Sequence, residues 1–349
     1  MRFAFTDDQR AFAGGVRAVL DDLCPPPAVR SAWNEEPAPA EALWRQLAGI
    51  GLLGALVPES DGGLGLDELD ILLCLEESGR AAAALPLVET VVVAARLLAG
   101  TEQASRLAAL AAGELRVSAI LDGSFLVPWA GFCDWVLVDS GNAVYLLPAQ
   151  ECVIERVPTV DRARPLGRLS AVGQLSAVPG AWPTGQEYLV SDDPRRIGRA
   201  RQAGTLATAA QLIGLAERML WMTVGYVKAR EQFGVPIGSF QAVKHALADA
   251  LLAVELARPL VYAAAWAHVH DTDDADRDVA AAKIRAGEAA GLVARTALQC
   301  HGGMGYTQEY DLHLWLKRTW ALQASWGQPG ELRAQVARSL GLSIAVPAG

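Results

Sequence analysis

Two short segments of the sequence carry residue types that could hold an anion. In "QCHGGMGY" (299–306), Gly302 and Gly303 would let backbone N–H groups approach an anion closely, although glycines at a helix end commonly form only a cap and a turn. In "YVKAREQFG", Arg230 is either an anion ligand or a solvated cation near a helix end, and Phe233 belongs either to a site or to the core. Taken alone, neither segment distinguishes a binding site from ordinary helix-end chemistry.

Other common chemistries find no support. His268 and His270 are two residues apart on an expected helix, so they face roughly opposite sides and cannot share a metal ion. The sequence has no G-x-S-x-G elbow, no P-loop and no dinucleotide-binding fingerprint after a strand. These observations argue against a metal site, a serine hydrolase and a nucleoside-triphosphate enzyme.

The composition predicts a folded globular protein. The chain has 349 residues, of which 52% are hydrophobic and 20% charged, and this is enough apolar material for two or three packed domains. The net charge of −9 and a pI near 5.1 argue against a nucleic-acid partner, because proteins that bind phosphate backbones usually carry a basic stripe.

The termini and the cysteines predict a cytoplasmic protein without a membrane partner. The start "MRFAFTDDQR" lacks the apolar run of a secretory signal, and no uninterrupted apolar run reaches the roughly 18 residues of a membrane helix. The five cysteines are odd in number and form no C-x-x-C pair, as is typical of reduced thiols in the cytosol. They are Cys24, Cys74, Cys133, Cys152 and Cys300.

Apolar periodicity divides the chain into three predicted domains. Residues 1–114 are helical: Thr6 and Gln9 form a capping box that starts a helix ending at the prolines after Cys24, and further helices are expected in "PAEALWRQLAGIG" and from Asp67 in "DELDILLCLEESGR". Residues 115–193 hold short β-rich runs, "RVSAIL", "DWVLV", "AVYLLP", "CVIERV" and "EYLV", which predict a small, reduced β-domain.

Residues 194–349 return to the helical period. Helices are expected up to Arg230, from Ser239 to His270, from Asp276 to Gln299 and from Glu309 to Ala324, and four such helices with short connections are typical of a bundle. The predicted fold is therefore α+β and mostly α, with an N-terminal helical domain, a small middle β-domain and a C-terminal four-helix bundle.

Three long segments resemble the acyl-CoA dehydrogenase family, flavoenzymes that introduce an α,β double bond into acyl-CoA thioesters. "LWRQLAGIGLLGALVPESDGGLGL" resembles the family's N-terminal signature, "AREQFGVPIGSFQAVKHALAD" its C-terminal Arg-x-x-Phe-Gly segment, and "QCHGGMGYTQEYDLHLWLKR" its Gln-x-x-Gly-Gly-x-Gly-Tyr segment. The resemblance implies the same three-domain fold and an FAD bound between subunits, each end of which contacts a different chain.

The resemblance also implies which residues hold the cofactor. In the family, these motif positions grip the pyrophosphate and adenosine half of a neighbouring subunit's FAD, and a guanidinium, amides and closely approaching backbone suit a diphosphate. The positions are Arg230, Gln241, Gln299, Gly302 and Gly303, with Phe233 packing nearby. This half of the cofactor site is expected to be intact.

The other half of the site departs from the family. Members carry a Thr-Glu-Pro-x-x-Gly-Ser stretch and then a Trp-x-Thr/Ser stretch whose backbone and hydroxyl groups bind the isoalloxazine ring. Here "GELRVSAIL" is followed almost at once by "DGSFLVPWAGF", and the nearest remnant, Pro128-Trp129-Ala130, has no hydroxyl. We therefore expect that the chain does not hold its own flavin in the usual manner.

The catalytic base is missing as well. Abstraction of the α-proton needs a carboxylate within hydrogen-bond reach of the substrate. Most members carry a Glu after the last bundle helix, where this sequence has Trp326, and some carry it before a Gly-Leu-Ala stretch, where this sequence has Gly204. No residue is assigned as catalytic.

Other acidic residues are poor replacements for the base. Glu255 lies three residues before Arg258 and is most simply a surface ion pair, while Glu231 and Glu309 flank the expected cofactor loops.

The departures together predict the non-catalytic subunit of a heteromeric acyl-CoA dehydrogenase. The sequence resembles the degenerate, shortened chain of actinobacterial heterotetramers that are associated with sterol side-chain degradation, in which this chain completes the FAD site of a catalytic partner. The isolated chain is then inactive, although it could form a homodimer. Two alternatives stay open: an autonomous homomeric dehydrogenase with a relocated base, and a catalytically dead scaffold or CoA-ester binding protein.

Overall fold

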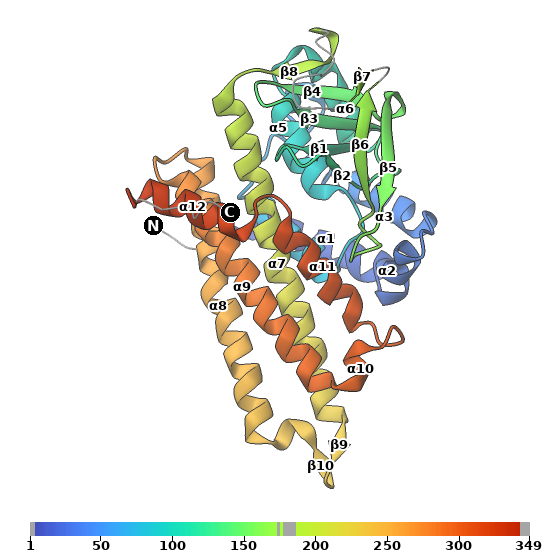
Figure 1. Ribbon diagram of the computed structural model, residues 1–349, viewed down its shortest axis with the longest axis vertical. Helices are drawn as coiled ribbons and strands as arrows, with labels where there is room; N and C mark the ends of the chain where they lie inside the picture. The colour runs from blue at the N-terminus through green and yellow to red at the C-terminus, as the bar shows by residue number, and fades with distance from the viewer. Residues whose placement is uncertain (1–3, 173–174, 177–185, 343–349) are drawn as a thin grey trace.

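A computed structural model describes residues 4–172, 175–176 and 186–342 of the chain. N-terminal helices, a small β-domain and a bundle of long helices form the molecule (Figure 1). The β-domain lies at one end of the bundle, and the short hairpin of β9 (Glu231–Gln232) and β10 (Val235–Pro236) lies at the other. The predicted α+β, mostly helical architecture is confirmed, while the domain boundaries at 114/115 and 193/194 stay a prediction.

The first helix begins where the sequence predicts. The Thr6 hydroxyl accepts the Gln9 N–H at 3.1 Å, and the Gln9 side chain accepts the Thr6 N–H at 2.8 Å, which completes the capping box. The helices of this part are α1 (Asp7–Leu23), α2 (Pro26–Trp33), α3 (Ala38–Gly49), α4 (Leu72–Arg80), α5 (Ala95–Leu98) and α6 (Leu107–Ala111). Between them lie the short 3-10 helices η1 (Glu59–Asp61) and η3 (Glu102–Arg106) and the π-helix η2 (Val88–Ala94).

One helix of this region was missed, and the start of another was predicted too early. The prolines after Cys24 end α1 as predicted, and they also begin the unpredicted α2, because proline suits the first turn of a helix, where its missing N–H would be unpaired anyway. Helix α4 begins at Leu72 rather than at Asp67, because the Asp67 carboxylate accepts the N–H groups of Leu69 and Asp70 and holds a turn there.

The β-domain contains two small sheets. One has the order β1 (Val117–Ile120), β3 (Trp135–Asp139), β4 (Val144–Pro148) and β8 (Leu189–Ser191), with β1 parallel to β3. The other has the order β2 (Leu126–Pro128), β6 (Leu166–Val172) and β5 (Cys152–Val157), with β7 (Leu175–Ser176) beside β6. The five predicted β-runs are strands, whereas β2 and β6 were missed because their apolar runs are short or interrupted by Gly167 and Arg168.

Four long helices form the predicted bundle. They are α7 (Pro194–Ala229), α8 (Gln241–Val269), α9 (Ala275–His301) and α11 (Leu312–Ala324), and α9 packs against the other three. The short α10 (Gly303–Tyr306) follows α9, and α12 (Pro329–Ser339), which the sequence reasoning did not predict, packs back on α9. The short 3-10 helices η4 (Ala149–Glu151), η5 (Gln186–Tyr188) and η6 (Ile237–Ser239) complete the described elements.

Helix α8 is apolar on more than its buried face. Among the described residues, it is the one helix that is long and apolar enough by composition to cross a membrane, which the sequence reasoning did not anticipate. The same test is passed by core helices, and α8 packs within the bundle. Leu252, Leu256 and Leu260 nevertheless leave one stripe of α8 exposed, because residues four apart share a helix face.

Helices α4 and α7 cross in close contact through two glycines. A Cβ at Gly79 would lie 2.1 Å from the Gln211 carbonyl oxygen, and a Cβ at Gly214 would lie 1.9 Å from the Glu76 carbonyl oxygen. Only glycine allows the two backbones to approach this closely. The N-terminal helices are therefore fixed firmly against the bundle.

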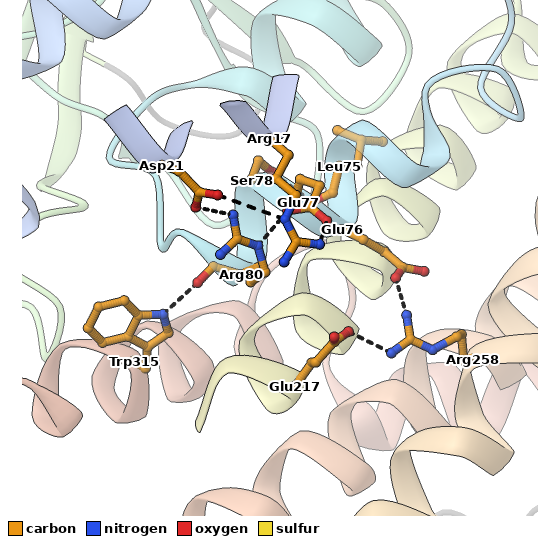
Figure 2. Close-up of polar contacts among 10 residues, drawn as sticks. All are labelled: Arg17, Asp21, Leu75, Glu76, Glu77, Ser78, Arg80, Glu217, Arg258 and Trp315. Carbon is orange, nitrogen blue, oxygen red and sulfur yellow. Dashed lines mark hydrogen bonds and ion pairs between the residues drawn. The ribbon is translucent and has the colours of Figure 1, made fainter. Parts of the chain in front are cut away.

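An ionic network extends this contact to α8 (Figure 2). Arg258 pairs with the buried Glu76 of α4 and, at 2.7 Å, with Glu217 of α7, whereas Glu255 is 3.8 Å away. The expected Glu255–Arg258 ion pair is present, but it is the longest of three, because tertiary packing gives Arg258 two further carboxylate partners. Burial raises the pKa of Glu76 to about 7 despite this guanidinium.

Candidate functional site

The residues expected to hold a neighbour's pyrophosphate lie at the hairpin end of the bundle. Arg230 caps the C-terminus of α7, and its carbonyl accepts the Ile237 N–H at 2.8 Å across the β9–β10 hairpin. Phe233, at the tip, has 93% of its surface exposed and a left-handed φ of 54°, and it makes an edge contact with Phe240 at 6.2 Å. A large aromatic side chain held in water in a strained conformation is typical of a surface that binds another molecule.

The other predicted ligands lie on elements that meet this end. Gln241 is the first residue of α8, while Gln299, Gly302 and Gly303 lie where α9 ends and α10 begins, and all four are exposed. The rings of Tyr226 on α7 and His301 on α9 stack at 4.2 Å, which joins the end that carries Arg230 to the end that carries Gln299. An exposed guanidinium, two amides and two glycines on joined helix ends fit a diphosphate supplied by another chain.

A cavity of about 930 Å³ lies at the other end, between the β-domain and the bundle. The β-domain contributes Pro128 and Arg164 to its walls, α7 contributes Thr205, and the end of α11 contributes Trp320 and Trp326. This volume falls within the range of small-molecule sites, about 300 to 1,000 Å³. The cavity is therefore large enough for an organic ligand.

The two positions at which the resemblance places a catalytic carboxylate lie against each other beside this cavity, and Trp326 lines it. A Cβ built on Gly204 would lie 2.4 Å from Cε3 of the Trp326 indole, so the ring occupies the space beside the glycine. The Thr205 hydroxyl donates to the Trp326 carbonyl at 2.9 Å and holds that residue at a left-handed φ of 54°. A carboxylate is missing at both positions, and Gly204 has no room for one.

The acidic residues that do line the cavity are engaged elsewhere. The Asp122 carboxylate accepts the Ser124 N–H, Asp139 forms an ion pair with Arg201, and Glu331 caps the first turn of α12. Glu231 and Glu309 are exposed and lie outside the cavity walls. The geometry supplies no evident replacement for the base among the described residues.

The segment Pro128-Trp129-Ala130, where the family would bind the flavin ring, is engaged in a contact within this chain. Trp129 is buried with a left-handed φ of 60°, and its indole N–H donates to Glu89 of the π-helix η2 at 3.0 Å. Ala130 provides no hydroxyl. The residues present at this place therefore do not fit the usual contacts to an isoalloxazine ring.

A buried charged cluster beneath the cavity was missed by the sequence reasoning. Arg164 pairs with Glu89 at 3.4 Å, and Arg318 pairs with Asp161 and donates to the Ala83 carbonyl at 2.7 Å. Both guanidiniums also lie over the Trp129 ring, at 5.8 and 5.6 Å from its centre. These charges come from three separate parts of the chain, so the pattern along the sequence gives no signal of their meeting.

Lys283 of α9 fixes the segment that carries Trp326. Its buried ammonium donates to the carbonyl oxygens of Leu322 and Ser325, both at 3.0 Å, at the C-terminus of α11. Burial, together with the charge of Arg164, lowers the pKa of Lys283 to about 7. The turn after α11 is thus held from α9 by Lys283 and from α7 by Thr205.

The two histidines lie apart, as their spacing predicts. His268 is buried beside Glu68 and Gln202, whereas His270 is exposed and stacks on Trp266 at 4.3 Å. No group of three His, Cys, Asp or Glu side chains suited to a metal ion occurs among the described residues.

A helical domain, a small β-domain and a helical bundle, with a cavity between the last two, define the acyl-CoA dehydrogenase class of fold. Residues 6–114 match the acyl-CoA dehydrogenase N-terminal domain, and residues 198–341 match the C-terminal domain. The chain belongs to the acyl-CoA dehydrogenase family, as the three sequence motifs indicate.

Similar proteins include actinobacterial members of the family. The chain is 34% identical over 295 residues to the acyl-CoA dehydrogenase IpdE2 of Mycobacterium tuberculosis, covering 84% of this chain and 85% of that protein. It superposes with a TM-score of 0.83 and 28% identity on a chain of the ChsE4–ChsE5 complex from Mycobacterium tuberculosis, covering 99% and 100% of the two chains. For a variant of the Tcur3481–Tcur3483 steroid ACAD, the TM-score is 0.81 at 26% identity, covering 96% and 98%.

Proposed function

We propose that this chain is the non-catalytic subunit of a heteromeric acyl-CoA dehydrogenase and completes the FAD site of a catalytic partner. The observation that carries the proposal is the contact between Trp326 and Gly204. Neither of these residues carries a carboxylate, and the Trp326 indole fills the space beside Gly204. Proton abstraction from an acyl-CoA needs such a group, so catalysis falls to the partner subunit.

The hairpin end of the bundle supports the second half of the proposal. Arg230 would bind the partner's FAD through its pyrophosphate, with Gln241, Gln299 and the backbone at Gly302 and Gly303 as further donors and Phe233 as an apolar contact. When bound, FAD supplies the acceptor for the hydride removed from the acyl chain. This chain's own residues hold and orient the cofactor's diphosphate.

The exposed leucines of α8 support assembly with another chain. Leu252 and Leu256 are each 56% exposed and Leu260 is 43% exposed, and an apolar stripe of this kind is typical of an interface. Two similar structures are heteromeric by their names, the ChsE4–ChsE5 complex and the Tcur3481–Tcur3483 steroid ACAD. We therefore favour a catalytic acyl-CoA dehydrogenase as the partner, a cytoplasmic location, and a role in lipid metabolism that includes sterol side-chain degradation.

Flavin absorbance tests the proposal. The chain is purified alone and after co-expression with a full-length relative that carries the catalytic Glu. A colourless chain alone and a yellow complex with one FAD for each pair of chains are expected. A chain that is yellow and active alone would replace the proposal with the autonomous enzyme, and a complex without flavin would replace it with the scaffold or CoA-ester binding protein.

Restoring one carboxylate should not restore activity. Trp326→Glu in the isolated chain is expected to give no acyl-CoA dehydrogenation, because the Trp129-Ala130 remnant still lacks the hydroxyl that holds the flavin ring. The assay is reduction of an artificial electron acceptor with acyl-CoA and added FAD, and Trp326→Gln is the matched control. Turnover by Trp326→Glu that exceeds the control would show that the β-domain holds flavin after all.

A further inference from the structure

The buried charges beside the cavity do not balance. Arg164, Arg318 and Lys283 are 6%, 4% and 3% exposed, while the buried carboxylates of this cluster are Glu89 and Asp161. Lys283 has no carboxylate partner among the described residues and contacts only carbonyl oxygens. Three cations thus face two anions, and an uncompensated charge in a buried place is unfavourable.

Arg164 is the cation of this cluster that lines the cavity. Within the described part of the chain, its guanidinium makes one hydrogen bond, a long one of 3.4 Å to Glu89. Glu89 also accepts the Trp129 indole N–H at 3.0 Å, so it is shared. A guanidinium has five N–H donors in a planar fork and keeps its charge in proteins, so most of the donor capacity of Arg164 is unused.

The lining carboxylates do not supply the missing anion. Asp139 pairs with Arg201, Asp122 is exposed and accepts the Ser124 N–H, and Glu331 is exposed at the start of α12. Lys283 can shed its proton, since its pKa is lowered to about 7, and the two remaining cations then balance the two buried carboxylates. The spare N–H donors of Arg164 remain in that state as well, because a guanidinium keeps its proton.

Part of the remaining wall is apolar and aromatic. Trp320 of α11 and Trp326 just after it line one side of the cavity, and Phe125, Leu126 and Pro128 line it from the β-domain. A guanidinium fork is matched in shape and charge by a carboxylate, and aromatic walls favour a flat apolar body.

We propose that this cavity binds a carboxylate ligand with a flat apolar body, and that Arg164 is the anchor for the carboxylate. The inference rests on the proposed function, because a flavin held by this chain itself would occupy the same space. It assigns to the subunit a binding site of its own, separate from the exposed hairpin end that faces the partner's cofactor.

Calorimetric titration of the full chain with 2-naphthoate and with its neutral analogue 2-naphthamide tests the proposal. The two probes have the same ring system and differ in charge. We expect 2-naphthoate to bind at least about tenfold more tightly, because hydrogen bonds from a guanidinium to a carboxylate are roughly twice as strong as those between neutral groups. Equal affinities, or no binding of the carboxylate, would overturn the proposal without the use of any variant.

Variants locate the anchor. Arg164→Lys keeps the charge but loses the fork, and Arg164→Met loses both, so the affinity for 2-naphthoate should fall in that order while 2-naphthamide is unaffected. Arg162→Met is the matched control, because Arg162 lies two residues away, has a side chain that is 52% exposed, and does not line the cavity. If the Arg164→Lys protein has the same free energy of unfolding as the unmodified chain and retains full affinity for 2-naphthoate, the assignment of Arg164 as the anchor is wrong.

The outcomes for the two proposals are distinguishable. A colourless chain that does not bind 2-naphthoate would refute the carboxylate site but would remain consistent with the proposed function. A chain that is yellow when purified alone, and whose flavin prevents 2-naphthoate binding, would refute the proposed function and the carboxylate site together.

Discussion

The two ends of the bundle differ in what they present. At the hairpin end, Arg230 and Phe233 are exposed and chemically suited to a ligand that comes from another chain. At the cavity end, Trp326 and Gly204 occupy the two positions where the family carries its catalytic carboxylate, and charged side chains are buried nearby. Gly204 and Arg230 are 26 residues apart along α7, which is about 39 Å at about 1.5 Å per residue. Functional parts this far apart can change independently.

The largest effect on stability is expected at the cavity end. Arg318→Met leaves the Asp161 carboxylate buried and unpaired, so the free energy of unfolding should fall by about 3–5 kcal/mol. Urea denaturation measures it. Arg333→Met, at an exposed ion pair with Glu288, is the control and should change the free energy of unfolding by less than about 1 kcal/mol. Similar losses for both variants would contradict the contrast between a buried and an exposed charge.

At the hairpin end the effect should fall on the cofactor and not on folding. Arg230→Ala is expected to weaken FAD retention in the heteromeric complex by about 1.5–3 kcal/mol, the contribution of a charge-assisted hydrogen bond. Flavin content after dilution measures the loss, and Lys228→Ala, an exposed cation of the same helix turn, is the control. Unchanged flavin content in Arg230→Ala would remove this residue from the site.

The pH dependence of stability should report Lys283. Its folded pKa, about 7, is depressed below the ordinary value of 10.5, so above pH 7 the unfolded chain binds more protons and stability rises with pH. Between about pH 7 and 8.5 the gain is up to about 2 kcal/mol. Above this window, the raised pKa values of Cys24 and Cys74 act in the opposite direction.

The control for this window is Lys283→Met, in which the rise should disappear. Glu76, with a pKa raised to about 7, makes stability fall as pH rises below the window and does not interfere within it. A rise that survives in Lys283→Met would assign the titration to another group.

The smallest effect on stability should come from Phe233. Because this side chain is 93% exposed, Phe233→Ala should change the free energy of unfolding by less than about 0.5 kcal/mol. The same variant should weaken assembly with the partner, measured by sedimentation of the mixed subunits. A large loss of stability with normal assembly would reverse the comparison between the two ends.

Local patterns along the chain predicted the elements better than the contacts between them. The capping box at Thr6 and the period of α8 and α9 were readable from neighbouring residues, because helix caps and amphipathic faces are local. Helix α4 began later than predicted since the Asp67 side chain competes for backbone N–H groups. The pairing of Arg258 with Glu76 required knowledge of how two domains pack.

In the candidate site, too, the local sequence motifs could be recognised and the tertiary contacts could not. Motif residues such as Arg230 and Gln299 could be proposed as cofactor ligands because their spacing resembles that of the family, and the absence of a carboxylate at Trp326 could be read directly. The cluster of Glu89, Arg164 and Lys283 could not, because its members are 75 or more residues apart and meet only through tertiary packing. The contact of Trp326 with Gly204 is unpredictable for the same reason.

The contact between Trp326 and Gly204 would make a carboxylate at either position difficult to acquire in evolution. A lineage that regained an acidic side chain at Gly204 would first drive it into the Trp326 ring, 2.4 Å from the new Cβ, and would lose stability before it gained any activity. Replacing Trp326 first would leave a cavity beside Gly204, where no side chain covers the backbone of α7. Each single step is therefore disfavoured, and the proposed subunit would stay dependent on a partner for its catalytic carboxylate.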